Sequence, residues 1–382
     1  MPTIPDRAAG LPRSGIRAIM DAAWAADHPV VRLEVGQPDA APPAHVLEAM
    51  TAAIEARDTG YTPNAGIPEL RAACSAKLDR VNGIHRTPEE ILVVAGSMQG
   101  LSSVLLAVAR PGGQVLIPDP GWPNYAMACR LVGLEAVRYP LRPDDDYRPD
   151  LDAMSGLMGS DTVAVLVNSP SNPLGTVIAA DDLAVIHRLC RDNDAWLISD
   201  ECYDEIVHDG AAPSPGALAG ADDVIAVHSF SKTYAMTGLR VGYVSGPPAV
   251  IRTMTVMQEA LVACVNGPAQ RAAVAALEGP QDFVADQGAI YRRRRDTAVA
   301  TATELGLSHL RPTGAFYLWL PIGPAVGDDG VAFCTRLVEE HGVAVAPGDT
   351  FGPGGRGAVR VSLAASEEQI VEGLTRLLTA IA

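Results

Sequence analysis

Short apolar runs, many of them rich in β-branched residues, alternate with helix-like patterns between about residues 90 and 246. Continuous apolar runs of this kind are typical of strands that are covered on both faces of a sheet. Helical spacing separates several of the runs, most clearly at 98–109 and at 181–193, where acidic residues come first and basic residues last. The pattern predicts a large α/β domain with a doubly wound, mostly parallel sheet. The predicted strands cover residues 91–96, 114–119, 163–169, 195–201, 224–230 and 241–246.

The remainder of the chain has a different pattern, in which strands and helices come in small groups. Such grouping predicts a second, smaller α+β domain, and a chain of 382 residues is long enough for two. The first forty residues, rich in proline and alanine, are expected to pack on it. We therefore predict a large domain from 45–285 and a small domain from 1–44 with 286–382. The small domain's predicted strands are 315–322, 343–347 and 358–364, and its predicted helices lie near 328–341 and 366–381.

The charge of the chain excludes some classes of partner. The formal net charge of −16 argues against nucleic acid, because phosphate backbones are bound through lysine and arginine. The basic run YRRRR at 291–295 is interpreted as the solvated face of a helix. No segment approaches the roughly 18 uninterrupted apolar residues of a membrane span, so no membrane partner is expected.

The cysteines predict a reducing compartment. They lie far apart and form no Cys-x-x-Cys pair, so we interpret them as reduced core residues. The first fifteen residues have no apolar segment typical of secretion, and a cytoplasmic location is the prediction. The six cysteines are Cys74, Cys129, Cys190, Cys202, Cys264 and Cys334.

One lysine stands at the end of a predicted strand, in SFSKTYAMTGLRVGY (229–243). The chain has only two lysines, Lys77 and Lys232, against 27 arginines. An amine is a nucleophile only when neutral, and the ordinary lysine pKa is about 10.4. Burial beside an apolar strand and the nearby Arg240 would both lower that pKa. A lone lysine is more often a surface charge, but its rarity in this chain favours a reactive amine at position 232.

A turn from strand to helix at residues 95–100 is a candidate anion site. The backbone N–H groups of Ser97 and Met98, after Gly96, would point at an anion with the helix dipole behind them. Ser229 and Arg240, on either side of the lysine, could complete the cradle. Taken alone, the Gly-Ser pair is equally typical of a tight turn with a helix cap.

Other polar residues also follow predicted strands, where α/β sheets bind their ligands. Asp200 ends a buried strand and needs a partner, either a protonated ring nitrogen or an arginine. Tyr203 lies three residues further on. Asn172 follows another strand, in a turn where asparagine is also ordinary. Trp122 is a candidate for stacking on a flat ring, or a simple packing residue.

Together these stretches resemble the class I/II aminotransferases, fold type I enzymes that depend on pyridoxal 5′-phosphate. The resemblance runs in chain order from about residue 13 to 365 and is specific only in combination. It is carried by YTPNAGIPELR (61–71), AGSMQG (95–100), DPGWPNY (119–125), NSPSNPLGT (168–176), DECYDE (200–205), SFSKTYAMTGLRVGY (229–243) and VRVSLA (359–364).

The resemblance implies roles for the residues around the cofactor. Lys232 would form the aldimine with the cofactor and then shuttle the substrate's Cα proton. Asp200 would keep the pyridine nitrogen protonated, so that the ring accepts electrons. Asn172 and Tyr203 would bond the phenolic oxygen, and Trp122 would stack on the ring. The phosphate would be held by Gly96, Ser97, Met98, Ser229 and Arg240.

The resemblance also implies how substrate and partner subunit meet the site. Arg360 matches the arginine that grips the substrate α-carboxylate, and Gly36 would allow close backbone approach. Asn172 would also bind the substrate. Tyr61 matches a tyrosine that reaches the phosphate of the neighbouring subunit. A homodimer with shared active sites is therefore expected, and no metal.

One departure from the family bears on the substrate. In similar prokaryotic enzymes that act on aspartate, a lysine often stands where this chain has Met98. A methionine cannot bind a second carboxylate, so a dedicated aspartate aminotransferase is not expected. Met98, Phe316 and Tyr317 would suit an apolar or aromatic side chain instead.

The predicted function is transfer of an amino group between an L-α-amino acid and a 2-oxo acid. A cofactor-dependent lyase, decarboxylase or cyclising synthase of specialised metabolism is the alternative, because these share the scaffold. A non-catalytic regulator that binds the cofactor is a remote alternative. Known regulators of this kind carry an N-terminal DNA-binding helix-turn-helix, but only about forty residues precede this large domain, and the chain is acidic.

Overall fold

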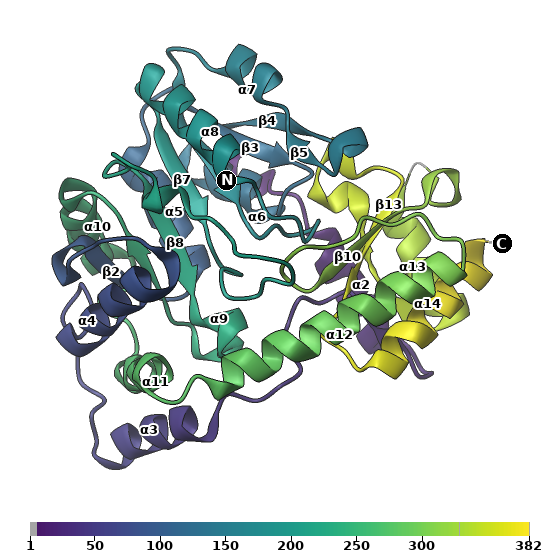
Figure 1. Cartoon of the computed structure of the whole chain (residues 1–382), viewed down its shortest axis with the longest axis horizontal. Helices are drawn as coiled ribbons and strands as arrows, with labels where there is room; N and C mark the ends of the chain where they lie inside the picture. The colour runs from purple at the N-terminus through teal and green to yellow at the C-terminus, as the bar shows by residue number, and fades with distance from the viewer. Residues whose placement is uncertain (1–5, 328, 382) are drawn as a thin grey trace, which may run out of the picture.

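A large, mostly parallel sheet forms the body of the molecule (Figure 1). The computed structural model describes residues 6–327 and 329–381. The strand order is β2-β9-β8-β7-β6-β3-β4-β5; β8, β7, β6, β3 and β4 run parallel, β9 is antiparallel to its two neighbours, and β5 is antiparallel to β4. This confirms the predicted fold class. The strands are β2 Ile91–Val94, β3 Gln114–Asp119, β4 Glu135–Arg142, β5 Arg148–Pro149, β6 Thr162–Asn168, β7 Trp196–Asp200, β8 Ile225–Ser229 and β9 Gly242–Ser245.

The central strands are buried on both faces, as their continuous apolar sequences predict. In β6, Leu166 packs into one apolar cluster while its neighbours Val165 and Val167 pack into another. Successive strand residues point to opposite faces, so each face of the sheet has its own core. The helices that flank the sheet are α3 Ala44–Glu55, α4 Pro68–Lys77, α5 Ser97–Val108, α6 Asn124–Val132, α7 Leu151–Leu157, α8 Ala180–Asp192, α9 Phe230–Thr233, α10 Pro248–Leu261 and α11 Gly267–Glu278.

The C-terminal part holds two small sheets beside the large one. β10 Tyr317–Pro321, β13 Ala358–Ser362 and β12 Ala346–Pro347 form an antiparallel sheet, and β1 Val31–Arg32 pairs parallel with β11 Val343–Ala344. The predicted strand 343–347 is thus wrong in detail, because β11 and β12 belong to different sheets. The helices here are α12 Asp282–Glu304, α13 Gly330–His341 and α14 Glu367–Ile381. Residue 328 of the predicted helix 328–341 lies outside the described residues.

The N-terminal segment returns to this C-terminal part. After the short α1 Asp6–Ala9, helix α2 Gly15–Ala25 packs against α13 and β12, and Figure 1 shows α2 beside the C-terminal elements. Helix α12 runs from the neighbourhood of α11 to these elements (Figure 1). The exact division into two domains stays a prediction.

Helix α12 contains the basic run at 291–295. Its interpretation as a solvated face is wrong for Arg295, whose side chain is only 2% exposed and forms an ion pair of 2.6 Å with Asp209. A buried arginine of this kind ties the helix to the loop after β7.

The described cysteines are all free thiols. Five of them are buried and Cys264 is half-buried, which confirms their interpretation as unpaired and largely core residues. Among the described residues, no helix is both long and apolar enough to cross a bilayer. The cytoplasmic location stays a prediction.

Candidate active site

A cavity of about 680 Å³ opens at the carboxyl ends of the parallel strands. Its wall comes from the large sheet, from strands β10 and β13, and from the N-terminal segment including α2. Every residue predicted to bind the cofactor or the substrate carboxylate lines it except Gly96 and Tyr61. The predicted residues in the wall are Gly36, Ser97, Met98, Trp122, Asn172, Asp200, Tyr203, Ser229, Lys232, Arg240 and Arg360.

Lys232 projects into this cavity from the short helix that follows β8. Its Nζ donates a hydrogen bond of 2.6 Å to the backbone oxygen of Gly36. Burial, together with the charges of Arg360 and Arg240, lowers the pKa of Lys232 from 10.5 to about 8. The amine is therefore much closer to its neutral, nucleophilic form than an exposed lysine is.

The other lysine has the opposite environment. Lys77 is buried and forms an ion pair with Asp204, while Glu205 lies 3.6 Å away and the Asn82 Oδ1 accepts a bond of 2.8 Å. Although burial opposes its charge, these two carboxylates raise the pKa of Lys77 above its ordinary value. Lys77 is a structural cation, and of the two lysines only Lys232 faces the cavity.

Asp200, the last residue of β7, faces the cavity as a buried carboxylate. The Tyr125 hydroxyl donates a bond of 2.7 Å to its Oδ2, and the Cys202 N–H donates one of 3.2 Å to its Oδ1. Burial raises the pKa of Asp200, and no cationic side chain in residues 6–327 or 329–381 forms an ion pair with it. The carboxylate thus has room for a cation supplied by a ligand. Sequence reasoning missed Tyr125, although it follows the predicted Trp122 by one helical turn.

A cradle for an anion lies where α5 begins. Gly96 caps α5 with φ +81°, and a Cβ there would lie 2.3 Å from the Arg240 Nη2. The first N–H groups of α5 have no partner within the helix. The Cys202 thiol donates to the Ser97 Oγ at 3.0 Å, and the Ser229 Oγ accepts from the Ser231 N–H at 3.1 Å. Glycine at 96 is what lets the guanidinium approach the helix N-terminus.

Tyr203 and Gly36 meet around a tyrosine that comes from β10. The Tyr203 and Tyr317 hydroxyls are 2.8 Å apart, and a Cβ at Gly36 would lie 1.9 Å from the Tyr317 hydroxyl. Only glycine therefore fits at position 36. Phe316 packs against Tyr203, with ring centroids 5.5 Å apart, and is fully buried. Tyr317 lines the cavity whereas Phe316 does not, so the structure gives Phe316 no part in the cavity wall.

Arg360 is a fully enclosed guanidinium at the small-sheet side of the cavity. Its Nη1 donates 2.8 Å to the Asn172 Oδ1 and its Nη2 donates 2.5 Å to the Glu34 backbone oxygen. Its Nε has no hydrogen-bond partner, and its centre lies 4.3 Å from the Tyr317 ring centroid. Burial lowers the pKa of Arg360. An uncompensated buried cation facing a cavity is suited to bind a carboxylate.

Two predicted residues lie at the margins of the site. Trp122 is half-buried, lines the cavity and packs edge-on against Tyr125 with centroids 5.5 Å apart. Tyr61 is 93% exposed and does not line the cavity of its own subunit.

Comparisons with known proteins agree with this geometry. The family model of the aminotransferase class I and II family matches residues 28–377. The aspartate/prephenate aminotransferase of Thermus thermophilus is 38% identical over 350 residues, covering 91% of this chain and 90% of that protein. The chain belongs to the class I and II aminotransferases.

Two solved structures show how closely this aminotransferase shares the fold. The Thermus thermophilus aspartate aminotransferase tetra mutant 2, complexed with tryptophan, matches 100% of both chains with a TM-score of 0.95 and 35% identity. The aromatic aminotransferase of Pyrococcus horikoshii matches 94% of this chain and 98% of its own, with a TM-score of 0.88 and 35% identity. The protein is a transaminase that acts by pyridoxal-phosphate-dependent chemistry, as predicted from the motifs.

Proposed function

We propose that the cavity binds pyridoxal 5′-phosphate through Lys232 and Asp200, and that these residues carry out the amino transfer. The observation that carries this proposal is one cavity faced by both a half-buried amine of lowered pKa, at Lys232, and a buried carboxylate without a cationic partner, at Asp200. When bound, the cofactor supplies a ring that accepts the electrons left at the substrate Cα.

The chain's own groups would divide the work as follows. Lys232 attaches the cofactor through Nζ, and its freed amine later takes the proton from the substrate Cα and returns one. Asp200 holds a proton on the ring nitrogen, aided by the Tyr125 bond that fixes its orientation. The low dielectric around this carboxylate strengthens its pairing with a cation.

The remaining predicted residues would position the cofactor. The first N–H groups of α5, at Ser97 and Met98, would hold the phosphate with Ser229 and Arg240, while Gly96 keeps the approach open. Asn172 and Tyr203, both buried, would bond the phenolic oxygen. Trp122 would cover one face of the ring.

The substrates would be an α-amino acid and a 2-oxo acid bound through their shared carboxylate. Relatives of this chain are named for aspartate, prephenate and aromatic substrates, and one structure holds tryptophan. These names share the α-carboxylate and differ in the side chain. We therefore expect the shared α-carboxylate to bind Arg360, with Asn172 and the Gly36 backbone beside it.

The reaction type is tested by a half-reaction without an acceptor. The cofactor-loaded protein is mixed with single amino acids, and the products are quantified by mass spectrometry. A transaminase releases one equivalent of 2-oxo acid per site and keeps the amine on the cofactor. Release of carbon dioxide or ammonia with continuing turnover would instead identify a decarboxylase or a lyase.

Replacement of Arg360 tests the carboxylate clamp. We expect Arg360→Leu to lower kcat/KM for the amino acid by about 10²- to 10³-fold, because breaking a buried charge pair costs about 3–4 kcal/mol. Arg360→Lys should retain part of the wild-type kcat/KM, because lysine keeps the positive charge but lacks the two parallel donors of the guanidinium. The exposed Arg356, four residues earlier, provides a control: Arg356→Leu should stay within about twofold of wild type. An unchanged kcat/KM in Arg360→Leu would contradict the proposed role of Arg360 in binding the α-carboxylate.

We further propose a homodimer in which Tyr61 reaches the partner subunit's phosphate site. Its 93% exposure and its distance from its own cavity support a contact outside the subunit. Loss of one hydrogen bond to a charged group is worth about 1.5–3 kcal/mol, so Tyr61→Phe should weaken cofactor binding about tenfold or more in equilibrium dialysis. Trp24→Phe, at an exposed aromatic outside the cavity wall, is the control. A monomer in analytical ultracentrifugation would contradict the shared site.

A further inference from the structure

Part of the cavity wall consists of apolar side chains that have no assigned role in holding the cofactor or the α-carboxylate. It is formed by the side chains of Ile16 and Met20 on α2, Met98 on α5 and Met127 on α6, which we call the methionine subsite. We infer that the methionine subsite receives the substrate's side chain and that the enzyme prefers amino acids with large, flexible apolar side chains. This inference rests on the proposed function.

The methionine subsite brings apolar side chains from three helices to the wall of one cavity. Ile16 and Met20 are four residues apart on α2 and so share one face of that helix. Met98 is joined to the start of α6 by a bond of 3.5 Å from the Asn124 Nδ2 to its Sδ. All four apolar side chains are half-buried, so each keeps part of its surface open while lining the cavity.

Methionine suits a site that must fit side chains of different shape. Its unbranched thioether has several rotatable bonds and packs well against both aliphatic and aromatic groups. Three methionines facing one cavity can therefore adapt to leucine, methionine or phenylalanine.

The charges around the methionine subsite argue against a second carboxylate. Lys232, Arg240 and Arg360 already have roles, and the other cations of the wall are Arg13 and Arg17. Both are exposed, and Arg13 forms an ion pair with Asp21. Water weakens the attraction between an exposed cation and a substrate carboxylate.

A substrate side-chain carboxylate would therefore be placed against thioethers without a buried cation, and burying an unpaired charge is costly. An apolar side chain meets no such penalty in the same position. The methionine subsite should consequently select by apolar contact, with each well-placed methylene changing the rate by about 10-fold or more.

The test compares kcat/KM for leucine, methionine, phenylalanine, aspartate, glutamate and alanine. We expect the three large apolar substrates to exceed aspartate by about 100-fold. Reaction with aspartate and glutamate alone would overturn the inference while leaving the proposed function intact. Reaction with none of the six would instead count against the proposed function.

Variants test whether the methionine subsite determines the preference for the substrate side chain. Met98→Lys adds a cation at nearly constant length and should raise kcat/KM for aspartate and lower it for leucine, each about tenfold. Met20→Ala and Met127→Ala should lower kcat/KM about tenfold more for leucine than for alanine, whose side chain is too short to need the subsite. The conservative Met20→Leu should restore the leucine rate.

Binding of unreactive analogues gives a readout independent of turnover. In calorimetry, 4-methylpentanoate should bind the loaded wild-type enzyme more tightly than succinate, and Met98→Lys should reverse this order. Arg17→Gln should leave the wild-type order of the two affinities unchanged, because the inference gives the exposed Arg17 no role in binding the side chain. If Arg17→Gln abolishes activity with the preferred substrate or binding of its analogue, the substrate side chain is recognised through the charge of Arg17, and the inference fails.

Discussion

Lys232→Ala should lose the half-reaction with every amino acid, with a fall in rate of at least about 10⁴-fold. The expected loss is large because one side chain serves both as covalent anchor and as the proton carrier at Cα, and acid–base catalysis alone contributes about 10²- to 10⁴-fold. The measurement is stopped-flow absorbance with a saturating amino acid, after cofactor loading has been checked.

Lys232→Arg is the matched control for charge. It keeps a cation in the cavity, but a guanidinium stays protonated and is no nucleophile. We expect this variant to be as inactive as Lys232→Ala, although the phosphate cradle should still bind the cofactor. A half-reaction in either variant at more than a hundredth of the wild-type rate would show that another group performs the chemistry.

Asp200→Asn should lower the half-reaction rate by about 10²- to 10³-fold with little change in fold. The substitution keeps the shape and can still accept the Tyr125 hydrogen bond of 2.7 Å. It removes the negative charge that stabilises a proton on the ring nitrogen, and loss of one preorganised electrostatic group has effects of this size. The rate is measured at saturating amino acid, and cofactor content is measured separately.

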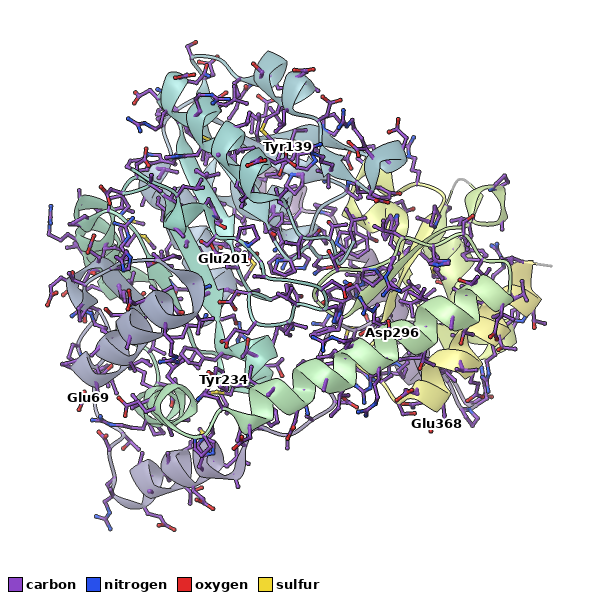
Figure 2. All side chains as sticks on the ribbon, in the orientation of Figure 1. Glu69, Tyr139, Glu201, Tyr234, Asp296 and Glu368 are labelled. Carbon is purple, nitrogen blue, oxygen red and sulfur yellow. The ribbon has the colours of Figure 1, made fainter. Side chains whose placement is uncertain are left out.

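The neighbouring Glu201 is the matched control. It is also buried, accepts a bond of 2.6 Å from the Ser214 hydroxyl and does not line the cavity. Figure 2 shows it in the interior of the molecule, unlike the peripheral Glu69 and Glu368. Glu201→Gln should therefore keep the half-reaction rate within about threefold. Equal losses in Asp200→Asn and Glu201→Gln would show a general effect of burial and not a role for Asp200.

The large sheet could be predicted because its strands are buried on both faces. Each residue of β6 is buried, so its sequence is continuously apolar from 163 to 167 and stands out from its surroundings. Strand β4, Glu135–Arg142, was missed because it is half-exposed and contains Glu135, Arg138 and Pro140. A strand near the edge of a sheet has no such uniform environment, and its sequence resembles a loop.

The site residues could be predicted because parallel strands end at one edge of the sheet. Asp200 ends β7 and Lys232 follows the neighbouring strand β8, and the local sequence was sufficient to predict both. The contacts between distant segments were not predictable. The Arg360 bond to Asn172 joins residues 188 positions apart, and the Gly36 approach to Tyr317 depends on how the two parts of the chain pack.

The methionine subsite shows the same limit. Met98 could be recognised from the sequence because it stands in the strand-to-helix turn of the candidate anion site. Met20 and Met127 lie on amphipathic helices, where methionine is ordinary, and Phe316 was expected beside the substrate but is buried against Tyr203. Which face of a helix borders a cavity is decided by tertiary packing.

The central claim is that the amine of residue 232, and not that of residue 77, holds the cofactor. It is tested most directly by loading the wild-type protein with pyridoxal 5′-phosphate, reducing with borohydride and mapping the modified peptide by mass spectrometry. The buried pair of Lys77 with Asp204 keeps that amine protonated, so the account predicts one pyridoxyl group per chain, on Lys232. A pyridoxyl group on Lys77, or no modified lysine at all, would contradict it.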